Sequence, residues 1–235
     1  MANKSIVSNT KLDAIANAIK AKDSSATTPM TLDQMATAIA AIPSGGGGVN
    51  LAELIDDSAS GTFTISDNDA TTVRKNFWRD CSRLEGISLP SVKTVKDYAF
   101  WFASKLNSVY LPACEEIKSQ AFYGTHMANI TLPAIKNIAY DVFNYCRELT
   151  TVDLGASLQQ IQGNAFQNCT HLTTFIIRNT SAVVTLGSNV FDSTPIKSGT
   201  GFIYVPDSLV SAYAQSTNWS AVASQIKGLS ELPTA

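Results

Sequence analysis

The four cysteines and two histidines are the side chains of this 235-residue chain best suited to metal binding or nucleophilic catalysis. A zinc site typically needs cysteines in C-x-x-C spacing, and no two cysteines in the sequence are that close. A catalytic nucleophile needs a histidine base oriented by a third group, and each histidine stands apart in a polar, turn-like segment. We therefore predict no catalytic residue, no metal site and no cofactor. The residues considered are Cys81, Cys114, Cys146, Cys169, His126 and His171.

Charge and hydropathy exclude two classes of partner. A net charge of −2 and a pI of about 5.6 are unlike the basic surface of a nucleic-acid-binding protein. No apolar run approaches the ~18 residues that would suggest a membrane span. The tract 45–48 is glycine only, but it precedes no helix, so it is a linker and not a phosphate-binding loop. We expect neither nucleic-acid binding nor membrane insertion.

A repeated unit organises most of the chain. One aromatic residue recurs in similar surroundings, with steps of 22, 22, 21, 23 and 25 residues. The unit reads approximately I-x-x-x-A-F-x-x-C-x-x-L-x-x-V-x-L-P, and a period of ~20–29 residues indicates a solenoid. The aromatic ladder consists of Trp78, Phe100, Phe122, Phe143, Phe166 and Phe191.

The V-x-L part of each unit alternates like a strand with one buried face. We expect these strands to stack at about 4.8 Å as a parallel sheet along one side of the solenoid. Pro90, Pro112 and Pro133 follow three of the strands, and a residue without an N–H ends the pairing there. The buried strand positions are Ile87/Leu89, Val109/Leu111, Ile130/Leu132, Val152/Leu154 and Phe175/Ile177.

This unit closely resembles the BspA-type (treponemal) leucine-rich repeats over about residues 70–206. The resemblance implies an α+β repeat solenoid with a parallel sheet, and it implies no particular activity. In the repeat register, Cys81, Ala103, Thr125, Cys146 and Cys169 share one column, with Gly124 as the alternative in the third, shorter copy. A cysteine that shares its column with other small residues is typical of a buried free thiol. Cys114 lies outside this column, and its role is left open.

Four segments are expected along the chain: a small α-helical hairpin (1–42), a glycine-rich linker (43–49), the solenoid (50–206) and a C-terminal helical cap (207–235). The stretch "GTFTIS" (61–66) supplies the first strand, because a solenoid end would otherwise expose half of its core. A helix that begins at Asp207 should cover the other end with Leu209, Tyr213 and Trp219.

The hairpin carries apolar residues at helical spacing in both of its helices. Two helices this short cannot bury both apolar stripes against one another, so we expect self-association or docking on another protein. The candidate oligomerisation residues are Leu12, Ile15, Ile19, Leu32, Met35 and Ile39.

Residues 8–48 resemble the N-terminal segment of tail and baseplate-associated proteins of phages that infect Firmicutes. The resemblance implies that the chain is mounted on a virion, after a stage in the bacterial cytoplasm, with the repeats displayed outward. It also implies other tail or baseplate proteins as partners and a homo-oligomer, with a trimer favoured.

Exposed aromatic residues form the candidate binding surface. Trp101 and Phe102 occupy two variable positions between the aromatic ladder and the small-residue column, where most other copies have polar residues. We predict that they lie at the surface and form a strip with equivalent residues of the next rungs. Aromatic faces near amides suit sugar rings or protein hot spots. Alternatively, these side chains cover loop backbone or a contact between subunits. The candidate ligand-binding residues are Trp101, Phe102, Tyr123, Asn144, Tyr145 and Asn168.

A second, lower-ranked surface is the outward column of the strands: Ser88, Tyr110, Thr131, Asp153 and Ile176.

The first hypothesis for function is a non-enzymatic, phage or prophage tail-associated structural or receptor-binding protein whose repeats recognise a bacterial surface glycan or protein. The alternative is a bacterial cell-surface adhesin or protein-interaction module.

Overall fold

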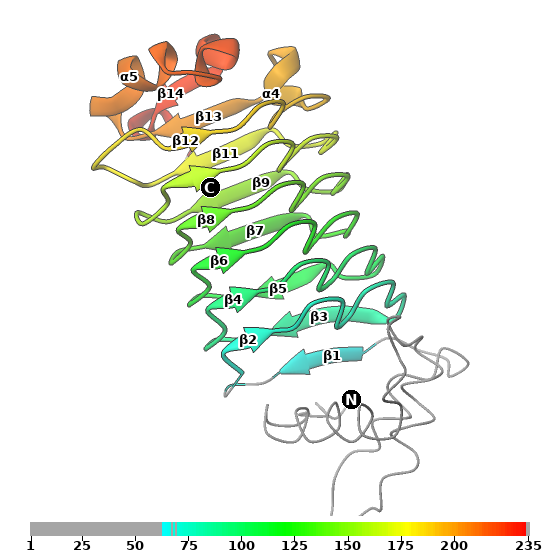
Figure 1. Ribbon diagram of the computed structural model, residues 1–235. Coiled ribbons are helices and arrows are strands. Elements are labelled where there is room, and N and C mark those ends of the chain that lie inside the picture. Colours follow the sequence, from blue (N-terminus) through cyan, green and yellow to red (C-terminus); the bar gives the residue numbers. More distant parts are fainter. Residues whose placement is uncertain (1–62, 67, 69, 234–235) are drawn as a thin grey trace, which may run out of the picture.

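The computed structural model describes residues 63–66, 68 and 70–233, which form one elongated solenoid (Figure 1). The predicted hairpin, its oligomerisation residues and the glycine-rich linker lie outside the described residues. Within them, no helix is long and apolar enough to span a membrane.

One side of the solenoid is built from the predicted parallel strands. The first three are β1 (Phe63–Ser66), β3 (Leu84–Ser88) and β5 (Ser108–Tyr110), which form a three-stranded sheet. A five-stranded sheet follows, made of β7 (Asn129–Leu132), β9 (Thr151–Leu154), β11 (Thr174–Ile177), β13 (Phe202–Val205) and β14 (Ile226–Gly228). The repeat unit and the cap strand within 61–66 are thus confirmed. The strands β3, β5 and β7 end just before the three prolines.

The sheet on this side is interrupted once, which the sequence analysis did not anticipate. No backbone pairing joins β5 to β7 within the described residues. The interruption falls at the short third copy, where only His126 separates Thr125 from Met127, whereas two residues separate Ala103 from Leu106. Counted from the ladder phenylalanine of the same copy (Phe122 and Phe100), β7 therefore begins one residue earlier than β5.

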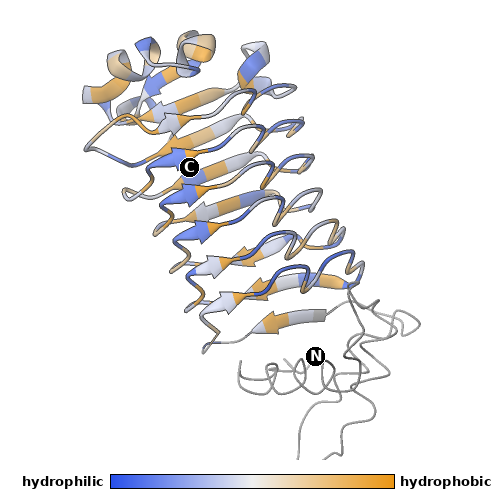
Figure 2. Ribbon diagram, viewed as in Figure 1, coloured by the Kyte–Doolittle hydropathy of each residue, from blue (hydrophilic) through white to orange (hydrophobic). Residues whose placement is uncertain are grey.

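A second parallel sheet lines another side of the solenoid and was not predicted. Its six short strands are β2 (Thr72–Val73), β4 (Thr94–Val95), β6 (Glu116–Ile117), β8 (Asn137–Ile138), β10 (Gln160–Ile161) and β12 (Thr185–Leu186). The second residue of each strand is buried in the core. Figure 2 shows hydrophobic residues in the strands of both sides and hydrophilic stretches in the connections between them.

A turn with two left-handed residues connects each short strand to the next long one. The paired positions are Asn76/Asp80, Tyr98/Phe102, Gln120/Gly124, Asp141/Tyr145, Asn164/Asn168 and Asn189/Ser193, all with positive φ. Consecutive turns stack through backbone hydrogen bonds, such as that from Phe100 N to Ala121 O at 2.7 Å. The register also places Thr125 in the small-residue column and Gly124 in the turn. Thr125 is fully buried there.

The core contains the aromatic ladder and all four cysteines. Phe100, Phe122, Phe143, Phe166 and Phe191 stack with ring centroids 5.0, 5.6, 5.1 and 6.5 Å apart. Trp78, at the N-terminal end of this ladder, is only half-buried. The cysteines are free and buried, as predicted for the column cysteines. Cys114 belongs to a second buried column, with Val92, Ile135 and Leu158.

The C-terminal end is closed by short helices and one further strand. The elements are α4 (Pro195–Ser198), η1 (Asp207–Leu209), α5 (Val210–Gln215), η2 (Trp219–Gln225) and η3 (Leu229–Glu231). The chain does turn helical at Asp207, first as a 3₁₀ turn, and Tyr213 and Trp219 are buried while Leu209 is half-buried. Strand β14, which pairs in parallel with β13, was not predicted.

Candidate functional site

Four aromatic side chains on three consecutive turns form a continuous surface, here called the aromatic strip: Trp101, Phe102, Tyr123 and Tyr145. Their ring centroids are 4.4 Å apart for Trp101–Phe102, 6.1 Å for Trp101–Tyr123 and 5.4 Å for Tyr123–Tyr145. Phe102 is 42% exposed and Tyr145 is 38% exposed, whereas Trp101 and Tyr123 are half-buried. The turns thus bring together the four rings that the sequence placed side by side.

The turn conformation determines how these rings are presented. Phe102 and Tyr145 occupy the second left-handed position of their turns, with φ of 50° and 63°. The turn between them has Gly124 at this position, and a Cβ there would come within 3.0 Å of the Phe102 ring. Glycine therefore provides both the left-handed backbone and the space that Phe102 occupies.

Two arginines stack on the rings at the two ends of the strip. The Arg79 guanidinium lies 4.2 Å from the centroid of the Trp101 ring, and that of Arg147 lies 5.3 Å from the Tyr145 ring. Arg79 also pairs with Asp80 at 3.3 Å. Such cation–π contacts are stabilising, modestly so at exposed sites. Sequence reasoning did not include these arginines, although Arg79 occupies the same repeat position as Trp101.

The two asparagines predicted beside the strip hold the turns together. Asn144 donates hydrogen bonds to Asp141 Oδ1 at 2.8 Å and Gln167 Oε1 at 3.2 Å, and its Oδ1 accepts one from Asn168 Nδ2 at 3.1 Å. Asn144 is only 5% exposed. Its predicted position at the surface is therefore wrong, because its amide links neighbouring turns. Asn168 remains half-buried.

Burial and nearby charge also affect Tyr123, at the middle of the strip. Its pKa is raised, first by burial of the phenol and then by the neighbouring Tyr145 and Asp141. The phenol therefore stays protonated and can donate a hydrogen bond at neutral pH.

The residues that could carry chemistry are not brought together. His126 and His171 are exposed in the segments that lead to the long strands, as predicted, and His171 Nδ1 contacts the Arg147 carbonyl. Burial raises the pKa of the Cys114 thiol to about 12 and that of Cys146 to about 11. These thiols are neutral and inaccessible at neutral pH. In the described part of the chain, no three His, Cys, Asp or Glu side chains are grouped to hold a metal ion.

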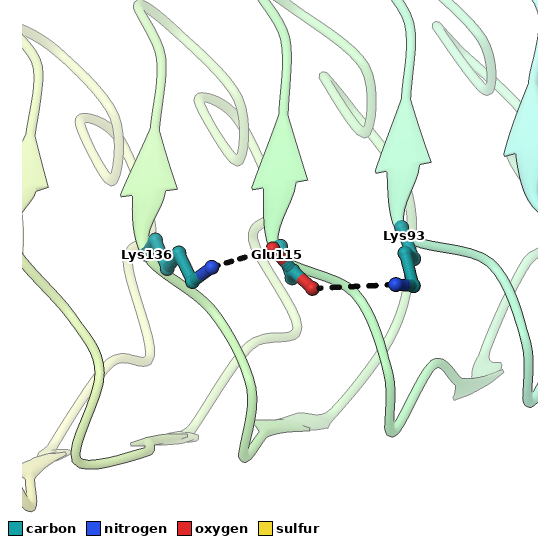
Figure 3. Close-up of polar contacts among 3 residues, drawn as sticks. All are labelled: Lys93, Glu115 and Lys136. Carbon is teal, nitrogen blue, oxygen red and sulfur yellow. Dashed lines mark hydrogen bonds and ion pairs between the residues drawn. The ribbon is translucent and has the colours of Figure 1, made fainter.

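A column of charged residues runs along the short-strand side (Figure 3). Glu115 lies between two lysines from adjacent repeats, with Oε2 2.6 Å from Lys136 Nζ and Oε1 3.9 Å from Lys93 Nζ. The hydrogen bond from Lys136 and the charge of that lysine lower the pKa of Glu115. Because these charges are partly exposed, their pairing stabilises neighbouring rungs only weakly.

The residues in the outward column of the strands differ in exposure and in pairing. Tyr110 is 57% exposed, whereas Asp153 forms a two-pronged ion pair with Arg178 (both N–O distances 2.8 Å). Ile176 is 6% exposed, so its predicted outward position does not make it a surface residue. This column is therefore not a uniform open sheet face.

Comparison with known proteins agrees with the repeat architecture. Six copies of the family described as "BspA type Leucine rich repeat region" match residues 71–197. A search of the curated proteins finds no match.

Two solved structures share the fold. The pneumococcal vaccine antigen PcpA is 21% identical, with a TM-score of 0.53, over 65% of this chain and 42% of its own. A leucine-rich cell surface protein from Faecalibacterium prausnitzii is 24% identical, with a TM-score of 0.52, over 66% of this chain and 41% of its own. This chain therefore spans about two fifths of the length of each, and the likeness concerns the fold.

The matched repeats cover more than half of the 235 residues, from 71 to 197. Their stacked strands, buried aromatic ladder and small-residue column lie in the positions that the repeat unit requires. The chain belongs to the BspA-type leucine-rich-repeat family.

Proposed function

We propose that this protein is a non-enzymatic recognition protein whose repeat domain binds a partner through the aromatic strip. The observation that carries the proposal is the exposure of Phe102 and Tyr145 within a continuous row of four rings. Large apolar side chains grouped at a surface mark interaction sites in soluble proteins. The stacked turns hold these side chains in place before a partner binds, so little conformational entropy is lost on binding.

The proposed setting is a phage or prophage tail, with a bacterial surface glycan or protein as the target. The resemblance of residues 8–48 to segments of phage tail and baseplate proteins supports this setting. The hairpin would join the chain to other tail proteins and to its own copies, with a trimer favoured. Several weak sites on one particle would then give strong attachment by avidity. The protein would be located in the virion.

The alternative function is that of a bacterial cell-surface adhesin or interaction module. It is favoured by the shared fold with a leucine-rich cell surface protein from F. prausnitzii. Mass spectrometry of purified phage particles and of surface-exposed cell proteins separates the two. Peptides of this chain in the particles support the tail protein, whereas peptides released from intact cells by external protease support the adhesin.

Binding of the labelled full chain to intact Gram-positive cells tests the role of the strip. We expect Phe102→Asn combined with Tyr145→Asn to remove most of the binding, because the two exposed rings are lost. Asparagine is chosen because Asn168 occupies the same left-handed turn position in a later repeat. The matched control is Tyr110→Thr, which replaces another exposed aromatic by the residue at the equivalent repeat position of the next rung, Thr131. Unchanged binding by the double variant would reject the strip as the binding surface.

A further inference from the structure

Two of the four rings in the aromatic strip occupy backbone positions that disfavour them. Phe102 and Tyr145 have positive φ, where the equivalent turns have Asp80, Gly124, Asn168 and Ser193. Aspartate, asparagine and glycine tolerate this conformation, whereas bulky side chains are uncommon there. Both rings also remain over one third exposed. Residues in such strained conformations cluster at active sites and ligand-binding sites.

Both faces of the Trp101 ring are already in use. Trp101 lies between the Arg79 guanidinium, 4.2 Å from its ring centroid, and the nearly parallel ring of Tyr123 at 6.1 Å and 24°. A flat sugar face would need an open ring face, which Trp101 does not offer. Tryptophan, tyrosine, phenylalanine and arginine are also the side chains enriched at protein–protein contacts. The strip therefore suits a protein partner better than a glycan.

The length of the strip limits the size of that partner. From the Arg79 turn to the Arg147 turn there are three rung steps of ~4.8 Å, or about 14 Å in total. About four residues of an extended chain span this distance at ~3.3 Å per residue. A folded domain or a second copy of this chain would normally bury about 800 Å² on each side. A short extended segment fits the strip better than either.

The charge at one end of the strip adds a further requirement. Arg147 is exposed, stacks on Tyr145 at 5.3 Å and forms no ion pair with any described residue. Arg79, at the other end, already has Asp80 as its partner. The Arg147 end therefore offers a carboxylate on the bound segment a forked, charge-assisted donor that has no carboxylate partner yet.

We propose that the aromatic strip binds a short, extended segment of a partner protein, with apolar side chains over Phe102, Tyr123 and Tyr145 and a carboxylate at Arg147. This inference rests on the proposed function, because it names the class of partner for the same surface. It also gives the segment a direction, since only one end of the strip offers an unpaired arginine.

Selection of short random peptides on the immobilised full chain tests the proposal. We expect the selected peptides to combine apolar residues with one Asp or Glu at a constant end. Tyr145→Asn should weaken the best peptide about tenfold, as for a hot-spot residue. Arg147→Gln should weaken binding of that peptide several-fold. The same variant should not change the affinity for a peptide in which the acidic residue is replaced by its amide (Asp→Asn or Glu→Gln). Tyr110→Thr should stay within about twofold of the unmodified chain. Equal thermal unfolding temperatures of the variants exclude misfolding as the cause.

Three results would overturn the inference. The first is selected peptides without an acidic residue, or with affinities that Tyr145→Asn and Arg147→Gln do not change. The second is strip-dependent binding to an array of purified bacterial glycans but not to peptides, which would leave the proposed function intact. The third is a fall in solution mass caused by Tyr145→Asn, because the strip would then be a contact between copies. Cell binding that survives Phe102→Asn with Tyr145→Asn would instead reject the proposed function itself.

Discussion

At the scale of single residues, backbone conformation decides what each turn position can accept. Four of the left-handed turn positions are held by asparagines, which tolerate positive φ: Asn76, Asn164, Asn168 and Asn189. In the sequence alone, Phe102 and Tyr145 stand out as aromatic residues at positions where most other copies are polar. The turn geometry adds that both residues have positive φ, which the sequence does not show.

Gly155 is a residue whose replacement should be costly. It takes the place of the prolines that end the earlier strands, and a Cβ on it would lie 1.8 Å from the Pro133 carbonyl oxygen. Because the obstacle is backbone, Gly155→Ala should lower the free energy of unfolding by about 1–3 kcal/mol, the usual cost of overpacking. Urea denaturation measures this value. Ser157→Ala, at an exposed position nearby, should change it little. Equal stabilities of the two variants would show that the turn relaxes freely.

The buried thiols predict a loss of stability at alkaline pH. The pKa of Cys114 is about 12 in the folded chain, against an ordinary value of 9.0, because burial disfavours the thiolate. The stability that the buried, protonated thiol contributes is fully present below pH 9. It is lost as the pH rises from 9 toward 12, because the thiol then ionises in the unfolded chain but not in the folded one. One unit above pH 9 corresponds to about 1.4 kcal/mol per thiol.

Denaturation of the unmodified chain and of Cys114→Val, at pH 8 and pH 10, isolates this contribution. Valine already occupies the same core column at Val92. The variant should lose about 1.4 kcal/mol less than the unmodified chain between the two pH values. An equal loss in both would mean that the Cys114 thiol ionises as easily in the folded chain as in the unfolded one.

Residue identities in the core were more predictable than those in the turns. Repeat register alone identified the small-residue column and the buried thiols, since a packed interior restricts residue size. The same register misplaced Asn144, because the hydrogen bonds among Asp141, Gln167 and Asn168 depend on how the turns stack. It also left Cys114 unexplained until its column with Val92 and Ile135 was visible.

At the scale of elements, the C-terminal cap completes the hydrogen bonding of the last short strand. The backbone N–H of Val184 donates to the Tyr213 hydroxyl at 3.2 Å, and the Val184 carbonyl accepts from Trp219 Nε1 at 2.7 Å. Asn218 Nδ2 donates to the Leu186 carbonyl at 2.7 Å. Three side chains thus stand where the backbone of a seventh strand would otherwise be.

Tyr213→Phe should lower the stability of the chain, because it removes the hydroxyl that accepts the hydrogen bond from Val184 N–H. The buried Val184 N–H would lose its acceptor, which costs about 1–3 kcal/mol. We expect a lower urea midpoint and faster hydrogen exchange of the Val184 amide, with little change for the Ile161 amide one rung away. Ser208→Ala, an exposed change in η1, is the control. Exchange at Val184 that stays slow would indicate another acceptor for its N–H.

Long strands were predictable as elements, whereas the second sheet was not. The V-x-L alternation extends over enough residues to indicate a strand. The short strands contain two residues each, so the single apolar residue per copy gives no period from which to infer one. The column formed by Val95, Ile117 and Ile138 was the available signal.

At the scale of the whole molecule, each repeat contacts only its neighbours, so stability should depend on where a defect lies. In such arrays stability is approximately a sum of repeat terms and nearest-neighbour interfaces. Phe143 stacks on a ladder ring at either side, 5.6 Å from Phe122 and 5.1 Å from Phe166, and is fully buried. Trp78 is half-buried at the N-terminal end of the ladder.

Phe143→Ala should therefore be more damaging than Trp78→Ala, although tryptophan is the larger side chain. A void in the middle weakens two interfaces at once and should cost about 3–5 kcal/mol, the range for a buried Phe→Ala change. The change at Trp78 should cost less, because its side chain already contacts water in the folded chain. Urea denaturation followed by circular dichroism compares the midpoints, and a smaller slope for Phe143→Ala would show that the two halves unfold separately. If Trp78→Ala proves equally costly, the N-terminal end is coupled to the whole array more strongly than nearest-neighbour packing allows.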